Sequence, residues 1–162
     1  KYDFTGDYLG TYPTGGGYDL NVSDPKIKGF EERNIILVKG YQHKFGRGLN
    51  ILEALLEIKE EIKDLKIIVF AAKEEVINFV NQSKWENPDN VEVIGQIGRF
   101  EVLDLMGQSL IYIGNSTSDG TPNTLLEAII MGCFPIQSNP GVATAEVIEQ
   151  GKNGLLLSII HI

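Results

Sequence analysis

The sequence predicts an α/β fold in which six short strands form one doubly wound parallel sheet. Short apolar runs of strand length alternate with helical segments across residues 31–162. Each run is apolar enough to be buried on both faces of a sheet, which is typical of parallel strands covered by helices. The composition agrees, because 43% hydrophobic and 22% charged residues are ordinary for a globular domain. A length of 162 residues suits one such domain.

The predicted strands and helices follow one another in strict alternation. The strands are expected at residues 34–39, 66–71, 91–94, 110–113, 134–137 and 155–157. The helices are expected at residues 47–62, 74–81, 100–107, 122–131 and 142–150. The first helix places Ile51, Leu55, Ile58 and Ile62 on one stripe at helical spacing. Right-handed crossovers then give a Rossmann-like sheet with the strand order 3-2-1-4-5-6.

Residues 1–30 differ from the rest of the chain, because they are polar, rich in turn residues and carry scattered tyrosines, among them Tyr18. We interpret them as a connecting segment that packs on the domain formed by residues 31–162. Since the chain begins at Lys1 rather than at methionine, we expect it to be a piece of a longer protein.

The charge and the cysteine count exclude several classes of function. The chain has 14 basic and 22 acidic residues, a net charge of −8, which argues against nucleic-acid or anionic-membrane binding as its main activity. No apolar run approaches the roughly 18 residues that a membrane helix needs. The single cysteine, Cys133, excludes a disulfide scaffold and is expected in the core.

The predicted strand order places a ligand site between two loops. The winding reverses between strands 34–39 and 110–113, and ligands bind at the carboxyl ends of such strands. The loop at 40–48 contains Gly40 and a basic cluster, and Arg47 lies where the next helix begins. Free N–H groups at that helix start favour an anion. A solvated, glycine-rich turn is the alternative interpretation of this loop.

The loop at 114–121 leads into a helix with an isolated carboxylate. Thr121 fits the N-cap and Pro122 the first helical position, so the amides that follow would form a second anion-binding end. Glu127 is the only charge between Gly120 and Gly132 and is costly to bury without partners. It compensates the helix dipole, lies on an exposed face of the helix, or accepts vicinal hydroxyls such as those of a ribose. No cluster of histidine, cysteine and carboxylate has metal-ligand spacing, so no metal is predicted.

The stretch 118–138 resembles the signature of retaining GT-B glycosyltransferases, the group that includes glycosyltransferase family 4 (glycosyl transferases group 1). Asp119, seven residues, Glu127-Ala128 and the later glycine and Pro135 follow that pattern. The stretch 146–156 and the opening around Gly40 and Arg47 also match, so the resemblance covers roughly residues 15–157. It implies one half of a GT-B fold, the C-terminal, donor-binding domain of a two-domain enzyme.

The resemblance also implies roles for individual residues. Glu127 matches the glutamate that holds the ribose hydroxyls, and Asp119 matches the one that faces the transferred sugar. Arg47 stands where the family has a lysine that contacts the diphosphate, and Asp119 and Arg47 are the implied catalytic residues. The implied donor-binding residues are Gly40, Arg47, Gln96, Ile97, Asp119, Gly120, Asn123, Thr124, Leu125 and Glu127.

Two positions depart from the family pattern. The family often has arginine where this chain has Tyr41, and its usual glutamate is one methylene longer than Asp119. Lys39 or Lys44 would then substitute in the clamp around the diphosphate.

The predicted function is therefore donor binding in a glycosyltransferase that moves a sugar with retention in glycan or polysaccharide synthesis. The expected ligand is a UDP-, GDP- or ADP-linked sugar, with no cofactor and no metal. The N-terminal acceptor domain would be missing, so we expect the isolated domain to be inactive. The protein is expected in the cytoplasm, or at the membrane surface through that missing domain. Three alternatives stay open: a GT-B-like nucleotide-sugar epimerase, a phosphorylase, and a non-catalytic nucleotide-sugar binding module.

Overall fold

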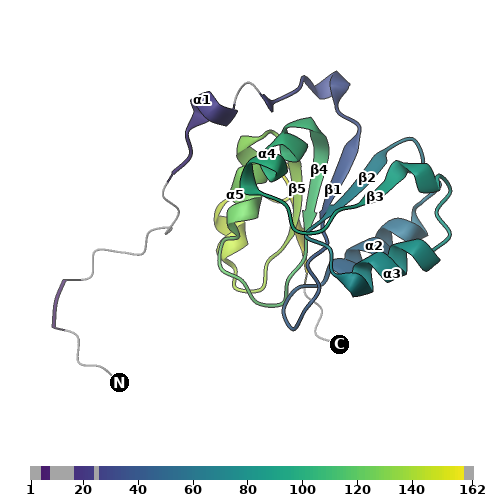
Figure 1. Ribbon diagram of the computed structural model, residues 1–162. Helices are drawn as coiled ribbons and strands as arrows, with labels where there is room; N and C mark the ends of the chain where they lie inside the picture. The colour runs from purple at the N-terminus through teal and green to yellow at the C-terminus, as the bar shows by residue number, and fades with distance from the viewer. Residues whose placement is uncertain (1–4, 8–16, 24–25, 159–162) are drawn as a thin grey trace.

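The computed structural model describes residues 5–7, 17–23 and 26–158. Its six strands form one parallel sheet in the order β3-β2-β1-β4-β5-β6, so the predicted topology is confirmed (Figure 1). The strands are β1 (Ile35–Lys39), β2 (Lys66–Phe70), β3 (Val91–Val93), β4 (Ser109–Gly114), β5 (Phe134–Ser138) and β6 (Leu155–Leu157). Each lies within one residue of its predicted bounds at either end.

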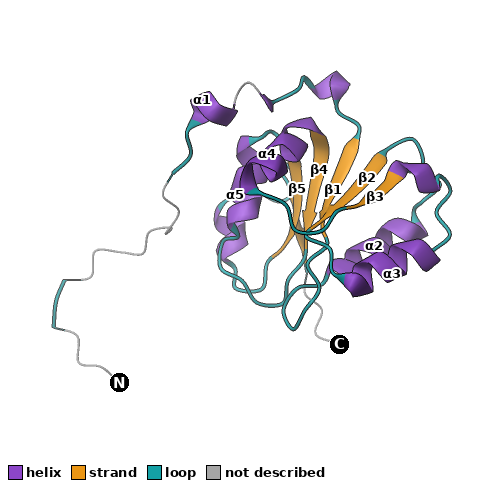
Figure 2. Cartoon of the chain, in the orientation of Figure 1, coloured by secondary structure: helices purple, strands orange, loops and turns teal. Residues whose placement is uncertain are grey.

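Helices cover both faces of this sheet, as a doubly wound fold requires. The helices are α1 (Leu20–Ser23), α2 (Gly48–Glu57), α3 (Glu74–Gln82), α4 (Arg99–Gln108) and α5 (Asn123–Ile130). Figure 2 shows α2 and α3 on one face and α4 and α5 on the other. Side chains of β1 alternate between two cores: Ile36 and Val38 belong to the α2–α3 side, and Leu37 to the α4–α5 side. A strand buried on both faces reads as a continuous apolar run.

The first long helix is shorter than predicted. α2 ends at Glu57, and residues 58–64 form turns instead of a further helical turn. Ile58, the third residue of the predicted apolar stripe, is 44% exposed, so its side chain packs too little to stabilise a helix there. Packing of an apolar face supplies most of a helix's stability, so periodicity alone overstated its length.

The connecting segment lies partly outside the described residues, which leave out 1–4, 8–16 and 24–25. Of its tyrosines, Tyr2, Tyr8 and Tyr12 fall there, and Tyr18 is described. The end of the segment contacts α4: Lys26 pairs with Asp104, and the Lys28 N–H donates to the Gly107 carbonyl at 2.9 Å. A Cβ atom on Gly107 would collide with the Lys26 carbonyl, so this close approach requires glycine.

Cys133 lies in the core, as predicted, with 5% of its surface exposed. Its Sγ donates to the Met106 carbonyl at 3.1 Å. Burial raises the pKa of the Cys133 thiol to about 12, although Arg33 lowers it in part. A thiol in this state is chemically inert, which fits a packing role.

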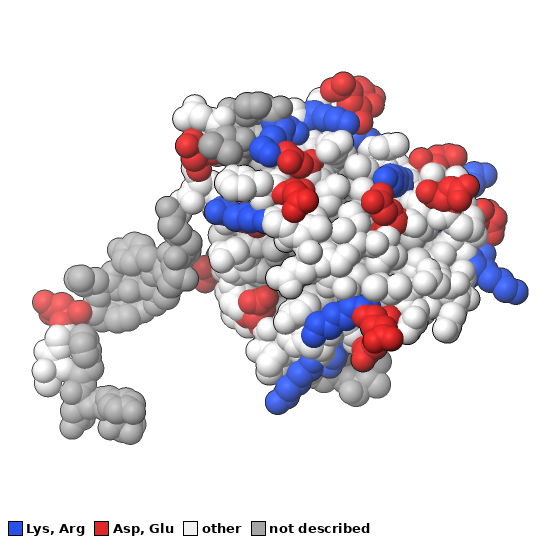
Figure 3. Space-filling view, in the orientation of Figure 1, with Lys and Arg blue, Asp and Glu red and all other residues white. Residues whose placement is uncertain are grey.

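Charged side chains of both signs are interspersed on the face drawn in Figure 3. They do not gather there into a basic patch, in keeping with the net charge of −8. Within the described ranges, no helix is both long and apolar enough to cross a bilayer.

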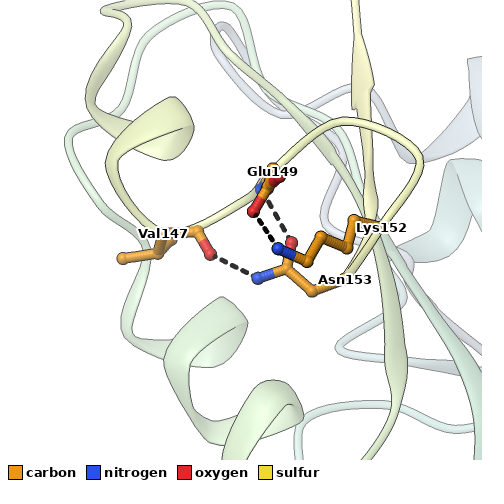
Figure 4. Close-up of polar contacts among 4 residues, drawn as sticks. All are labelled: Val147, Glu149, Lys152 and Asn153. Atoms are coloured by element: carbon orange, nitrogen blue, oxygen red, sulfur yellow. Dashed lines mark hydrogen bonds and ion pairs between the residues drawn. The ribbon is translucent and has the colours of Figure 1, made fainter.

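The helix predicted at residues 142–150 is wrong. A short 3₁₀ helix, Ala143–Glu146, is followed by a loop that the side chain of Asn153 holds (Figure 4). Asn153 Oδ1 accepts from the Glu149 N–H at 2.7 Å, and its Nδ2 donates to the Val147 carbonyl at 3.1 Å. These are two of the backbone groups that a longer helix would pair internally. A side-chain amide can compete with helical hydrogen bonds in this way.

Candidate functional site

A pocket of about 200 Å³ lies where β1 and β4 end, between the two loops that the strand order singled out. From the first loop and the end of β1 it is lined by Lys39, Tyr41, His43, Phe45 and Gly46. From the second loop and its surroundings it is lined by Gly114, Asn115, Ser116, Ser118, Asp119, Pro122 and Gln137. Both apolar surface and polar side chains line it, among them Lys39, Asp119 and Gln137, so hydrogen-bonding groups are available to a ligand.

Backbone hydrogen bonds hold the two loops side by side. The Arg47 N–H donates to the Asn115 carbonyl at 3.1 Å, and the Thr117 N–H donates to the Phe45 carbonyl at 2.8 Å. Gly46 and Ser116 also pair as an isolated antiparallel bridge. These contacts hold the two loops together at several points and so fix the walls of the pocket between them.

The glycines of the first loop serve the packing of the loop itself. A Cβ on Gly40 would approach the Val69 side chain to 2.5 Å, and one on Gly48 would meet the Gly40 carbonyl carbon at 2.8 Å. In contrast, a Cβ on Gly120 would meet no atom within 4 Å. Gly40 and Gly48 are therefore required by the packing of the protein itself, whereas Gly120 borders open space.

Lys39 is a half-buried cation at the end of β1. Its Nζ lies 3.2 Å from Thr124 Oγ1 on α5, and the Tyr112 hydroxyl donates to the same oxygen at 3.1 Å. Burial lowers the pKa of Lys39, while the charges of Asp119 and Glu127 raise it in part. Lys39 thus brings positive charge to the pocket, which Asp119 also lines, whereas Glu127 acts on Lys39 from outside the pocket lining.

Three aromatic rings form the wall of the pocket where the family often has arginine. The Tyr41 and His43 rings lie 4.1 Å apart, and the His43 and Phe45 rings meet edge to face at 5.9 Å. Lys73 lies 5.2 Å from the centre of the Tyr41 ring. Tyr41 therefore cannot supply the charge of the family's arginine, although a lysine lies against its ring.

Glu127 is buried and paired with a residue that the sequence did not single out. Its side chain is 9% exposed, and Oε1 lies 2.7 Å from Nε of Arg99 at the start of α4. The Tyr18 ring lies 5.6 Å from the Arg99 guanidinium, and the Tyr18 hydroxyl donates to the Asn123 carbonyl at 3.4 Å. A buried carboxylate needs a partner, and the predicted donor-binding residues Gln96 and Ile97 lie three and two residues before Arg99. This closeness in sequence was the one signal that could have pointed to Arg99 as a residue of the site.

The start of α5 differs from the prediction. Pro122, not Thr121, is the N-cap, because its extended backbone (ψ 131°) delays the helix until Asn123. The Leu125 N–H donates to the Pro122 carbonyl at 3.0 Å, and the Leu125 side chain is fully buried. The amides of Asn123 and Thr124 are thus the first at the helix start, where backbone N–H groups lack helical acceptors.

Three further predicted residues, Arg47, Gln96 and Ile97, do not line the pocket. The Arg47 guanidinium donates to the His43 carbonyl at 3.3 Å, so it braces the first loop. Gln96 is exposed, and Ile97 is half-buried against the core on the α4–α5 side. No group of three histidine, cysteine or carboxylate side chains with metal-binding geometry occurs in the part of the chain that the structure describes.

The family model for glycosyl transferases group 1 matches residues 23–159. The chain therefore belongs to this family, as the resemblance implied. Its sheet is the Rossmann-like half of a GT-B fold. Among curated proteins, none matches the sequence.

Solved structures share the fold at low sequence identity. The C-terminal domain of a glycosyl transferase group 1 family protein (LpcC) from Francisella tularensis has a TM-score of 0.68 at 23% identity, over 87% of this chain and 80% of that one. Alr3699/HepE from Anabaena, solved with UDP and glucose, has a TM-score of 0.68 at 18% identity, over 88% and 41%. The pneumococcal O-GlcNAc transferase GtfA, solved with UDP and GlcNAc, has a TM-score of 0.66 at 21% identity, over 82% and 26%. The chain thus spans less than half the length of these last two proteins.

Proposed function

We propose that this chain is the donor-binding domain of a retaining glycosyltransferase and that the pocket between the β1 and β4 loops holds a nucleotide-sugar. The observation that carries the proposal is the buried carboxylate of Glu127, on a helix that begins beside the pocket. A carboxylate acceptor suits the vicinal hydroxyls of a ribose, because an ionised carboxylate accepts several hydrogen bonds. Family membership supports the same assignment.

In this proposal, two cationic side chains and the backbone N–H groups at a helix start bind the diphosphate. Lys39 ends β1 and its Nζ reaches Thr124 on α5, the Asn123 and Thr124 amides open α5, and Arg47 precedes α2. A nucleoside diphosphate gains negative charge as the bond to the sugar breaks. Donors that are already in place stabilise this charge without reorganisation. Lys39 thereby takes the role that the family's arginine has at Tyr41.

The sugar would lie toward Asp119, at the exposed tip of the second loop. Asp119 lines the pocket together with Ser118 and His43, and these groups can accept and donate hydrogen bonds to sugar hydroxyls. We propose transfer with retention in glycan or polysaccharide synthesis, with the acceptor bound by a second domain. This part of the proposal rests on the family pattern around Asp119 and Glu127.

A thermal-shift panel of UDP, GDP, ADP and their glucose- and N-acetylglucosamine-linked forms tests the proposal. A ligand that binds the folded state raises the melting temperature, so one base should stand out. UDP has the first place in the panel, because HepE and GtfA were both solved with it. If no diphosphate or nucleotide-sugar in the panel raises the melting temperature at millimolar concentration, the proposal is wrong.

A further inference from the structure

The guanidinium of Arg99 is the polar partner of the buried Glu127 carboxylate. Nε of Arg99 lies 2.7 Å from Oε1, and the side chains of Arg99 and Glu127 are 60% and 9% exposed. Among the described residues, no other side chain forms a hydrogen bond with this carboxylate. The contact uses one oxygen, so Oε2 and part of Oε1 still have lone pairs for a ligand.

Arg99 is itself held from two directions. Its backbone begins α4, where the Glu101 carboxylate accepts from the preceding Gly98 N–H at 2.8 Å. On the other side, its guanidinium lies 5.6 Å from the centre of the Tyr18 ring, within range of a cation–π contact. The helix start thus holds the Arg99 backbone, and the Tyr18 ring lies against its guanidinium. An arginine held in this way can orient the carboxylate with which it pairs.

We propose that Arg99 is a positioning residue for ribose recognition: it holds the Glu127 carboxylate oriented so that its open lone pairs receive the ribose hydroxyls. This inference rests on the proposed function, since it assigns a second residue to the same ribose site. Without Arg99, the Glu127 carboxylate would lose the side-chain hydrogen bond that fixes its orientation.

The test compares a nucleoside diphosphate with its 2′-deoxy counterpart, by calorimetry, on the full chain. The probe is whichever of UDP, GDP and ADP binds the wild type most tightly. The wild type should prefer the ribose form by about tenfold, the scale of one charge-assisted hydrogen bond. Arg99→Ala should narrow this preference to about threefold or less, and Arg99→Lys, which keeps the charge, should restore part of it. In a Glu127→Gln background, Arg99→Ala should change the preference no further.

A matched control is Lys152→Ala, which removes the same charge from an exposed pair with Glu149. Its ribose preference should equal that of the wild type. If Arg99→Ala weakens both nucleotides equally, Arg99 contacts the ligand elsewhere and the positioning role is wrong. If it changes neither affinity, the role is also wrong, while the proposed function stands. If the wild type binds none of the three diphosphates, the proposed function fails and this inference fails with it.

Discussion

The charge of Lys39 lowers the stability of the fold, because it is partly buried, but serves the proposed binding of the diphosphate. Burial lowers its pKa in the folded state, so near pH 7 the fold bears the cost of a partly desolvated charge. At pH values between this lowered pKa and the ordinary 10.5, the unfolded chain binds more protons, so this group's contribution to stability rises with pH. Lys39→Met should therefore leave the melting temperature at pH 7 unchanged or raised, and flatten this alkaline rise.

The same substitution should weaken binding of the nucleoside diphosphate by about 1.5–3 kcal/mol, the scale of a hydrogen bond to a charged group. Thermal melts at several pH values, together with calorimetry, measure both effects. The matched control is Lys44→Met, at an exposed position in the loop that follows β1. It should change neither the melting temperature nor the affinity much. A lower melting temperature with unchanged affinity would assign Lys39 a purely structural role.

Arg47 braces the first loop and precedes the α2 amides, so its loss should affect phosphate binding in particular. Arg47→Ala should reduce affinity for a nucleoside diphosphate by about 1–2 kcal/mol, and affinity for the nucleoside much less. Titration of both ligands measures the difference, and Arg47→Lys should recover most of it. Equal losses for both ligands would mean that Arg47 does not act on the phosphates.

The residues of the candidate site were predictable from sequence to different degrees. Glu127 could be singled out from its sequence neighbours alone, because it is one carboxylate within an otherwise apolar helix. Arg99 did not, because its pairing with Glu127 spans 28 positions and arises only when α4 and α5 pack together. The partner of Lys39 is hidden in the same way, since Thr124 lies 85 positions further along.

At the scale of elements, apolar runs located the central strands β1 and β2 well because these strands are buried on both faces, so nearly every residue of each run contributes to the pattern. The helix at 142–150 failed because Asn153, outside the predicted helix, binds the Val147 and Glu149 backbone. Hydrophobic periodicity contains no information on such side-chain competition.

The loop that replaces this helix gives a prediction of its own. Asn153→Ala removes both hydrogen bonds to the backbone, so the free energy of unfolding should fall by about 0.5–1.5 kcal/mol. Urea denaturation measures this as a lower midpoint at unchanged slope. Lys152→Ala in the same loop breaks only an exposed ion pair and should have little effect. An Asn153→Ala midpoint equal to that of the wild type would show that water replaces the side chain fully.

At the scale of the whole molecule, we expect the chain by itself to bind the donor but to transfer no sugar. Asp119, Tyr41 and Phe45 line the pocket and are exposed, so the sugar end of a bound donor would stay in contact with water. Fixed charges act weakly on a solvated leaving group, and in the proposed function a second domain, not this chain, holds the acceptor hydroxyl in line. Release of nucleoside diphosphate should therefore not depend on added acceptor. Sustained acceptor-dependent turnover by this chain would contradict the expectation.

The central claim is that Glu127 receives the ribose of a nucleotide in the pocket between the β1 and β4 loops. Calorimetric titration of the wild type and Glu127→Gln with the preferred nucleoside diphosphate tests it most directly. Glutamine keeps the size of the side chain, so the fold should persist while the hydrogen bonds to the ribose lose their charge. The account predicts binding weaker by about 1–3 kcal/mol at a similar melting temperature. Equal affinity for the two proteins would contradict it and would leave Glu127 as the buried partner of Arg99 alone.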